Sequence, residues 1–165
     1  MERCLVQILN LEECLGQIRS EFLNLKDCAI ILIYSPFSDA RGIKQFFNKR
    51  EVKEALERGV RVLVITRPDN KEALNCLTEF HANKKYNLEV YTRKGFHEKV
   101  IIIDDVDKKI TYIGSANFLS SSSSSSELIV RIDGKEVMDK ILNKIGLPRD
   151  EERYISQLRL DKEHI

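Results

Sequence analysis

Three short runs rich in apolar residues, separated by segments of helical periodicity, constrain this chain more than any other feature. The runs cover residues 28–34, 60–66 and 87–92. A continuous apolar run of this length is typical of a strand buried on both faces. Between and before them, apolar residues at steps of three and four predict helices over 8–25, 40–58 and 71–84. This alternation predicts a parallel sheet covered by helices.

After residue 92 the pattern changes. Two short apolar runs, 100–103 and 110–113, flank a polar turn, which predicts a β-hairpin. Residues 127–132 predict a further strand, and 135–145 predict a helix. The chain therefore predicts an α/β fold with a mixed, largely parallel β-sheet flanked by helices on both faces, as in an α/β/α sandwich.

The length of 165 residues suits one domain. We expect that domain to span residues 1–147, with a short helix or tail over 148–165. The net charge of +1 excludes a strongly basic protein that coats nucleic acid and a protein with a long acidic tail, although it permits a local basic patch. No apolar run approaches the ~20 residues of a membrane-spanning helix, so we expect no membrane span.

The four cysteines have neither CxxC nor metal-ligand spacing. They are Cys4, Cys14, Cys28 and Cys76. We interpret them as buried free thiols of a cytoplasmic protein, because the cytoplasm keeps thiols reduced.

Polar side chains gather around the predicted hairpin. His97 and Lys99 lie two residues apart at the start of its first strand, so period-two alternation places them on one face. Ser115 and Asn117 repeat that spacing at the end of the second strand. In an antiparallel hairpin these two ends are neighbours, so the four side chains should converge. Three of them donate hydrogen bonds to anionic oxygens and His97 can act as nucleophile or proton carrier, which predicts a phosphate site.

One spaced set of residues combines a histidine, a lysine and an aspartate with a later Gly-Ser pair and an asparagine. It reads His97-x-Lys99-x4-Asp104, followed by Gly114-Ser115-x-Asn117. This set resembles the HKD motif of the phospholipase D superfamily, and the strands and helices before it resemble the family fold over residues 1 to about 147. The chain holds one copy of the motif, as does the small bacterial endonuclease Nuc in that family.

The resemblance implies a C2 homodimer, because single-copy members build one active site from two chains. By resemblance, His97 of one chain attacks phosphorus and forms a phosphohistidine. His97 of the partner subunit protonates the leaving oxygen and then activates water. Lys99 and Asn117 of both chains hold the phosphate oxygens, with Ser115 nearby, and no metal or other cofactor is expected.

Two carboxylates complete the candidate site residues. Family members often have a carboxylate downstream of the motif that bonds the second nitrogen of the histidine ring, and Glu127 fits that role. Asp104 ends the first hairpin strand, and we expect it to hold the turn rather than to react. Nine residues separate Asp104 from Gly114, more than is usual in the family, so we expect a longer turn and an intact site.

Two loops near the motif have an open role. Residues 120–126 are seven consecutive serines, which cannot bury apolar area, so we expect a mobile loop. It is either a tolerated linker or a rim over the site. The loop 35–38, which contains Phe37, is equally consistent with an ordinary turn and with substrate contact.

Three functions compete. A nuclease, with DNA expected before RNA, is favoured by the single-copy architecture and by a cationic segment that leads into the motif. That segment carries Lys84, Lys85, Arg93, Lys94 and Lys99. A phospholipid phosphodiesterase or phosphatidyl transferase would use the same histidine chemistry, but we see no basic amphipathic helix for a membrane surface. The third is a catalytic or dimerisation module of a larger restriction or helicase assembly.

Overall fold

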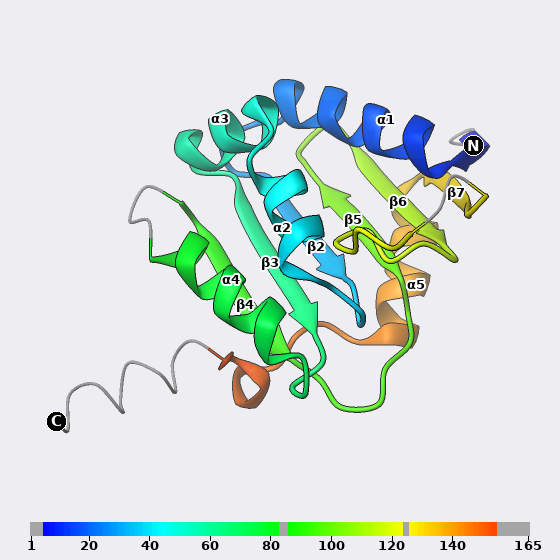
Figure 1. Ribbon diagram of the computed structural model, residues 1–165. Helices are drawn as coiled ribbons and strands as arrows, with labels where there is room; N and C mark the ends of the chain where they lie inside the picture. The colour runs from blue at the N-terminus through cyan, green and yellow to red at the C-terminus, as the bar shows by residue number, and fades with distance from the viewer. Residues whose placement is uncertain (1–4, 83–85, 124–125, 155–165) are drawn as a thin grey trace, which may run out of the picture.

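The computed structural model describes residues 5–82, 86–123 and 126–154, which contain one seven-stranded sheet (Figure 1). The strands are β1 (Leu5–Asn10), β2 (Ile30–Tyr34), β3 (Arg61–Thr66), β4 (Leu88–Thr92), β5 (Val100–Asp104), β6 (Lys109–Gly114) and β7 (Leu128–Asp133). Across the sheet they follow the order β1-β7-β6-β5-β2-β3-β4.

The sheet is mixed, as expected, but the expectation that it is largely parallel is wrong. The pairs β2–β3 and β3–β4 are parallel, and the four other neighbouring pairs are antiparallel. A parallel pair needs a crossover long enough for a helix, and such crossovers follow β2 and β3. Residues 93–99, between β4 and β5, form no helix, and β5 returns to pair antiparallel with β2.

Helices cover both faces of the sheet, as expected (Figure 1). One face carries α1 (Leu11–Asn24), α2 (Ala40–Phe47), α3 (Arg50–Arg58) and α4 (Lys71–His81), and the other carries α5 (Lys135–Ile145). Along β2, Ile31 and Ile33 face the four helices, whereas Leu32 and Tyr34 face α5. In the part of the chain that the structure describes, no helix is long and apolar enough to cross a membrane.

The bounds of three expected helices differ from the prediction. β1 occupies the start of the expected helix 8–25, because Asn10 and Glu13 form a capping box that begins α1 at Leu11. Each of the two residues donates its backbone N–H to the other's side chain at 2.9 Å. The expected helix 40–58 is divided at Lys49, whose backbone is extended. The expected helix 71–84 ends at His81, and residues 83–84 lie outside the described ranges.

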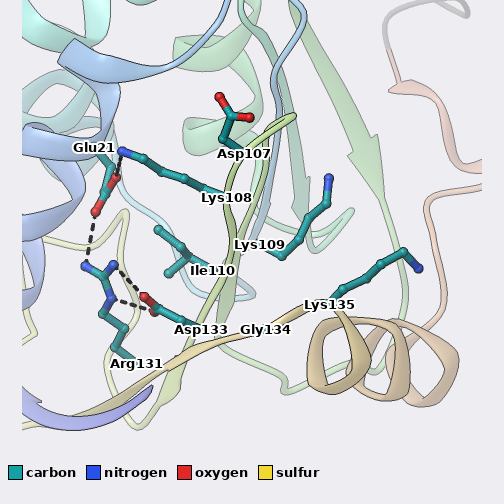
Figure 2. Close-up of a pocket in the computed structure, with 9 residues that line it drawn as sticks. All are labelled: Glu21, Asp107, Lys108, Lys109, Ile110, Arg131, Asp133, Gly134 and Lys135. Atoms are coloured by element: carbon teal, nitrogen blue, oxygen red, sulfur yellow. Dashed lines mark hydrogen bonds and ion pairs between the residues drawn. The ribbon is translucent and has the colours of Figure 1, made fainter. Parts of the chain in front are cut away.

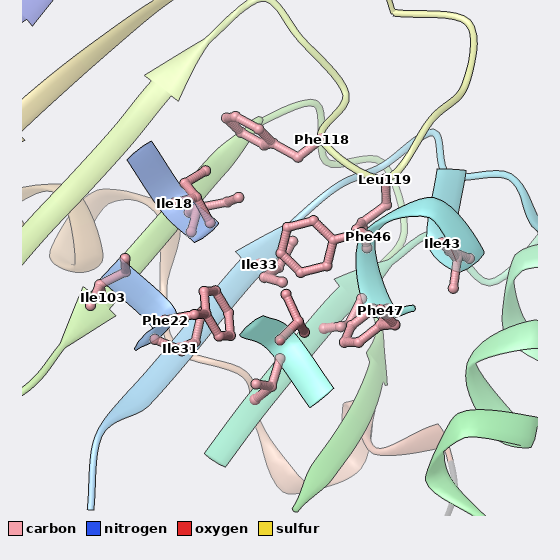
Figure 3. Packing of buried hydrophobic residues seen from close by; sticks show 14 of the residues in the cluster. Ile18, Phe22, Ile31, Ile33, Ile43, Phe46, Phe47, Ile103, Phe118 and Leu119 are labelled. Carbon is pink, nitrogen blue, oxygen red and sulfur yellow. The ribbon is translucent and has the colours of Figure 1, made fainter. Parts of the chain in front are cut away.

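Aliphatic and aromatic side chains together fill the core between the sheet and the four helices (Figure 3). Phe22 of α1 meets Phe46 of α2 edge to face, with ring centroids 5.9 Å apart, and Phe46 lies 5.2 Å from Phe47. All three are buried. Burial of one such side chain contributes about 1.5–3 kcal/mol, so this cluster holds α1 and α2 firmly against the sheet.

The cysteine prediction is confirmed in part. Cys14 and Cys76 are buried, and burial raises the pKa of the Cys14 thiol to about 12. Cys28 is exposed, contrary to expectation, because it lies in the turn before β2 rather than in the strand. Cys4 lies outside the described residues.

The chain after α5 returns to β4 at the sheet edge. Residues Asp150–Glu152 form a short 3-10 helix (η1), and Tyr91 of β4 bridges to Arg153. Arg93 Nε donates to Glu152 Oε1 at 2.9 Å, and a second nitrogen of Arg93 donates to the Ile145 carbonyl at 2.6 Å. The last part of the expected tail, residues 155–165, lies outside the described ranges.

Candidate active site

Five strand ends meet at one edge of the sheet, which we call the site edge. The parallel strands β2 and β3 both end there, and the antiparallel β5 begins there, with Val100 opposite Tyr34. β6 ends and β7 begins at the same edge, with Ile113 opposite Val100 and Ile129 opposite Gly114. The segments that carry the predicted histidine, lysine, serine, asparagine and glutamate therefore meet, as the hairpin prediction requires.

His97 and Lys99 precede β5 instead of forming its first residues, because β5 begins at Val100. The His97 N–H donates to Glu98 Oε2 at 3.0 Å, and Lys99 Nζ donates to the His97 carbonyl at 3.1 Å. The Lys99 carbonyl accepts the Gly114 N–H at 3.3 Å, which ties this segment to the end of β6. His97 is exposed, so a phosphodiester can reach its ring.

Gly114 allows the end of β6 to approach β7 closely. A Cβ at this position would lie 2.8 Å from the Ile129 Cα, closer than real Cβ contacts. This approach places Ser115 against β7, where the Leu128 N–H donates to Ser115 Oγ at 3.2 Å. Ser115 Oγ in turn donates to the Glu127 carboxylate. Among the described residues no hydrogen bond joins Glu127 to His97, so that partnership stays a prediction.

Asn117 is held by the start of the serine run. Its N–H donates to Ser123 Oγ at 3.1 Å, and Ser123 Oγ donates to the Asn117 carbonyl at 3.0 Å. The side-chain Oδ1 of Asn117 is buried and has no hydrogen-bond partner among the described residues. These contacts fix the backbone of Asn117, and binding of a phosphate by its side chain stays a prediction.

Asp39, the N-cap of α2, anchors the same run. Its Oδ1 accepts the Gly42 N–H at 2.6 Å, and its Oδ2 accepts the Ser121 N–H at 2.8 Å and Ser120 Oγ at 3.1 Å. Burial disfavours the charged carboxylate, but these hydrogen bonds outweigh it and lower the pKa of Asp39. Ser120 and Ser121, at the start of the run, are therefore bonded to the N-cap of α2, and mobility of the run as a whole stays a prediction.

Phe37 and Arg67 join the site edge from the loops after β2 and β3. The ring centroid of Phe37 lies 6.2 Å from that of His97, and Arg67 Cζ lies 5.2 Å from the centroid of Phe37. The sequence left the role of Phe37 open, and Arg67 was not among the predicted site residues. Their position after parallel strands was the available signal, because ligands gather at the carboxyl ends of such strands.

Asp104 lies at the opposite edge of the sheet, where it pairs with Lys109 across the hairpin turn. The structure therefore does not bring it to His97. Nearby, a hollow of about 380 Å³ is lined mainly by charged side chains (Figure 2). Glu21 pairs with Lys108 at 2.9 Å and with Arg131 at 3.2 Å, so much of this charge is neutralised within the lining.

The chemistry of the site edge suits an anionic oxygen more than a cation. It offers an imidazole, an ammonium, a hydroxyl and an amide from His97, Lys99, Ser115 and Asn117. Within residues 5–82, 86–123 and 126–154, no three His, Cys, Asp or Glu side chains are grouped as metal ligands would be.

Residues 26–146 match the family model described as "Cardiolipin synthase, PLD-like domain". The chain belongs to this phospholipase D-like family. The resemblance carried by the single motif is thus confirmed, and the chain is a member of a family of phosphodiesterases. A search of the curated proteins found no match.

Solved structures confirm the phospholipase D-like fold. NucT from Helicobacter pylori is 22% identical, with a TM-score of 0.60, and the match covers 86% of this chain and 93% of that one. Nuc from Salmonella typhimurium, described as a phospholipase D family member, is 19% identical, with a TM-score of 0.61 and coverages of 86% and 91%. The archaeal chromatin protein TrmBL2 is 15% identical, with a TM-score of 0.56 and coverages of 87% and 51%.

Proposed function

We propose that this phospholipase D-like chain is a metal-independent endonuclease, acting on DNA in preference to RNA, whose active site is shared across a homodimer. The observation that carries the proposal is that the segment with His97 and Lys99 meets the segment with Ser115 and Asn117 at the site edge. Its support is the match to the fold of Nuc and NucT over nearly their whole length.

The proposed reaction has two displacements. A ring nitrogen of His97 attacks phosphorus, the bond to the leaving oxygen breaks, and His97 of the partner subunit gives that oxygen a proton. The partner's His97 then takes a proton from water, whose oxygen attacks phosphorus and breaks the P–N bond. Covalent catalysis replaces one difficult step by two easier ones. Lys99 and Asn117 of both chains stabilise the charge on the phosphate oxygens.

Glu127 is proposed to orient the His97 ring in the assembled site. A carboxylate that accepts from one ring nitrogen fixes the tautomer and leaves the other nitrogen free to attack. In the single chain this carboxylate accepts a hydrogen bond from Ser115 Oγ instead. Ser115 therefore holds Glu127 at the site edge.

A strip of exposed apolar side chains supports the homodimer. Val6, Ile8 and Leu128 are 58%, 74% and 62% exposed. The register of β1 and β7 places them on the α5 face of the sheet, beyond the part that α5 covers. The backbone N–H of Leu128 donates a hydrogen bond to Ser115 Oγ, so the strip adjoins the candidate site. An apolar surface that adjoins a site with one histidine suits a second copy of the chain.

Ile8→Glu tests the use of this strip. A charge in a buried dimer contact is costly, so we expect the dimer to dissociate at micromolar concentration and activity to fall with it. Sedimentation velocity and a nuclease assay on the same samples measure both. Val106→Glu is the matched control, because Val106 is 68% exposed at the distant hairpin turn. A fully active Ile8→Glu monomer would exclude the shared site.

The function itself is tested by cleavage in the presence of EDTA. Wild type, His97→Ala and Lys99→Ala are compared on single-stranded DNA, duplex DNA and RNA. Lys26→Ala is the control for loss of a lysine charge, because Lys26 is exposed beside the hairpin turn at the opposite edge of the sheet. We expect wild type and Lys26→Ala to cleave DNA and His97→Ala to be inactive. Loss of all activity on chelation would contradict the mechanism. A covalent enzyme–substrate intermediate that survives acid would also contradict it, because a phosphohistidine is acid-labile.

A lipid substrate is the second candidate, because the matching family model is described as a cardiolipin synthase domain. The same histidine would transfer a phosphatidyl group from one headgroup to another. Vesicles containing phosphatidylglycerol, analysed for new phospholipid products, test this function. A product that requires His97, together with no cleavage of any nucleic acid, would replace the nuclease proposal.

A further inference from the structure

Phe37 is an exposed aromatic ring beside the proposed nucleophile. It is 45% exposed, the most exposed of the seven phenylalanines, all of which lie in the described residues. Its ring is tilted by 42° to that of His97, with the centroids 6.2 Å apart. A single exposed apolar ring is ordinary at a protein surface, so the informative feature of Phe37 is its position beside His97.

The Phe37 ring is held in place by contacts between the loops that follow β2 and β3. Asn70, at the N-terminus of α4, donates to the Ser38 carbonyl, and Ser38 Oγ donates to the Ser35 carbonyl at 3.1 Å. Arg67 lies against Phe37, and its Nε is 3.4 Å from Asp69 Oδ1. Phe37 is thus exposed without standing on a free loop tip, which lowers the entropy cost of binding through it.

We propose that Phe37 and Arg67 form a subsite that stacks the nucleobase next to the scissile phosphate. The subsite rests on the proposed nuclease function and makes single-stranded nucleic acid its preferred substrate. An aromatic face beside a cation is the combination by which proteins hold unpaired bases, with the aromatic stacking the base and the cation drawing the backbone. Bases in a duplex are already stacked on both faces, so Phe37 cannot reach them without unstacking.

The test uses substrates with one defined scissile bond. A short oligonucleotide has a phosphodiester at one linkage and methylphosphonates at all of the others, which fixes the position of cleavage. It is prepared with either a normal or an abasic nucleotide on each side of that bond, and as a single strand or a duplex. Wild type, Phe37→Ala, Phe37→Leu and Phe37→Trp are compared, with Val106→Ala as a control at the distant exposed valine.

We expect Phe37→Ala and Phe37→Leu to lower kcat/KM on the single strand by about five- to a hundred-fold, the effect of losing one base–aromatic stack. Phe37→Trp and Val106→Ala should retain activity, and duplex cleavage should change less than twofold. An abasic nucleotide on one side of the bond should slow wild type and leave Phe37→Ala unaffected. That pattern would also identify on which side of the phosphate the stacked base lies.

Each alternative outcome overturns the inference. Equal losses on single strand and duplex would exclude the preference for unpaired bases. Unchanged cleavage by Phe37→Ala, with His97→Ala inactive, would exclude the subsite but leave the nuclease intact. Dissociation of Phe37→Ala in sedimentation would assign the ring to a subunit contact. Absence of nucleic-acid cleavage by wild type would remove the proposed function and the subsite together.

Discussion

The absence of a Cβ at two glycines lets the segments around the site pack closely. At Gly114, a Cβ would collide with the backbone of β7, so a hydrogen there lets Ser115 reach Leu128 and Glu127. At Gly42, a Cβ would lie 2.6 Å from the carbonyl carbon of Leu119. This glycine lets α2 pack against the segment that follows Asn117. Both positions require glycine for space rather than for backbone freedom.

Gly114→Ala is expected to destabilise the fold and to damage the site. The added methyl must push β6 from β7, and overpacking of this kind costs about 1–3 kcal/mol. Urea denaturation measures the free energy of unfolding, and the nuclease assay measures activity at a temperature where the variant is folded. Gly16→Ala is the control, because a Cβ in the middle of α1 makes only an ordinary contact, 4.0 Å from a side-chain nitrogen of Arg19, and alanine favours a helix. A Gly114→Ala protein as stable and active as wild type would contradict the packing argument.

Polar contacts hold the ends of several elements in place. Asp39 joins α2 to the serine run, and Asn70 joins α4 to the loop of Phe37. Arg93, just after β4, bonds the last carbonyls of α5 and both oxygens of Glu152. The Arg93 guanidinium outweighs burial and lowers the pKa of Glu152 to about 2. The segment after α5 is therefore attached by a charged pair.

The Arg93–Glu152 pair predicts a pH-dependent stability. Because the pKa of Glu152 is lower in the folded chain than its ordinary 4.5, its contribution is complete above pH 4.5 and is lost as pH falls toward 2. A shift of this size corresponds to at most about 3 kcal/mol. We expect Glu152→Gln to be less stable than wild type at pH 7, with the difference vanishing near pH 2. Urea denaturation across this range measures it. Glu151→Gln, on the same short helix but exposed, should show no such convergence.

At the scale of the whole molecule, the main constraint on the proposed mechanism is that each chain carries one motif histidine. The proposed chemistry needs two, one to attack and one to move protons, so a single chain offers half of a site. The apolar strip of Val6, Ile8 and Leu128 lies beside that half. Activity should therefore be a property of the dimer and of its composition.

Mixed dimers test the shared site directly. Wild type is refolded with increasing amounts of His97→Ala, and nuclease activity is measured at constant wild-type concentration. A mixed dimer has one histidine at its site, so we expect activity to fall steeply as the inactive chain captures wild-type chains. Refolding with an equal excess of the Ile8→Glu variant carrying His97→Ala should leave activity unchanged, because it cannot pair. Activity that is indifferent to added His97→Ala would show that each chain works alone.

The sequence alone predicted the strands with continuous apolar runs. Residues 28–34 and 60–66 became β2 and β3 with small shifts, because burial on both faces leaves little alternative for such a run. β1 was missed, since its exposed Val6 and Ile8 follow no buried pattern and the capping box that ends it was not recognised. The direction of β5 was also beyond the sequence, because direction depends on which strand it meets.

Within the site, spacing and residue chemistry identified the motif, and they determined the family. They could do so because the motif residues lie on two neighbouring strand ends, where local geometry predicts proximity. Asp104 was placed at the turn for the same reason. The tertiary structure alone decided that Phe37 lies beside His97 and Arg67 beside Phe37, that Asp39 anchors the serines, and that an apolar strip adjoins the site. These contacts join residues far apart in the chain, and only the packing of the whole sheet brings such residues together.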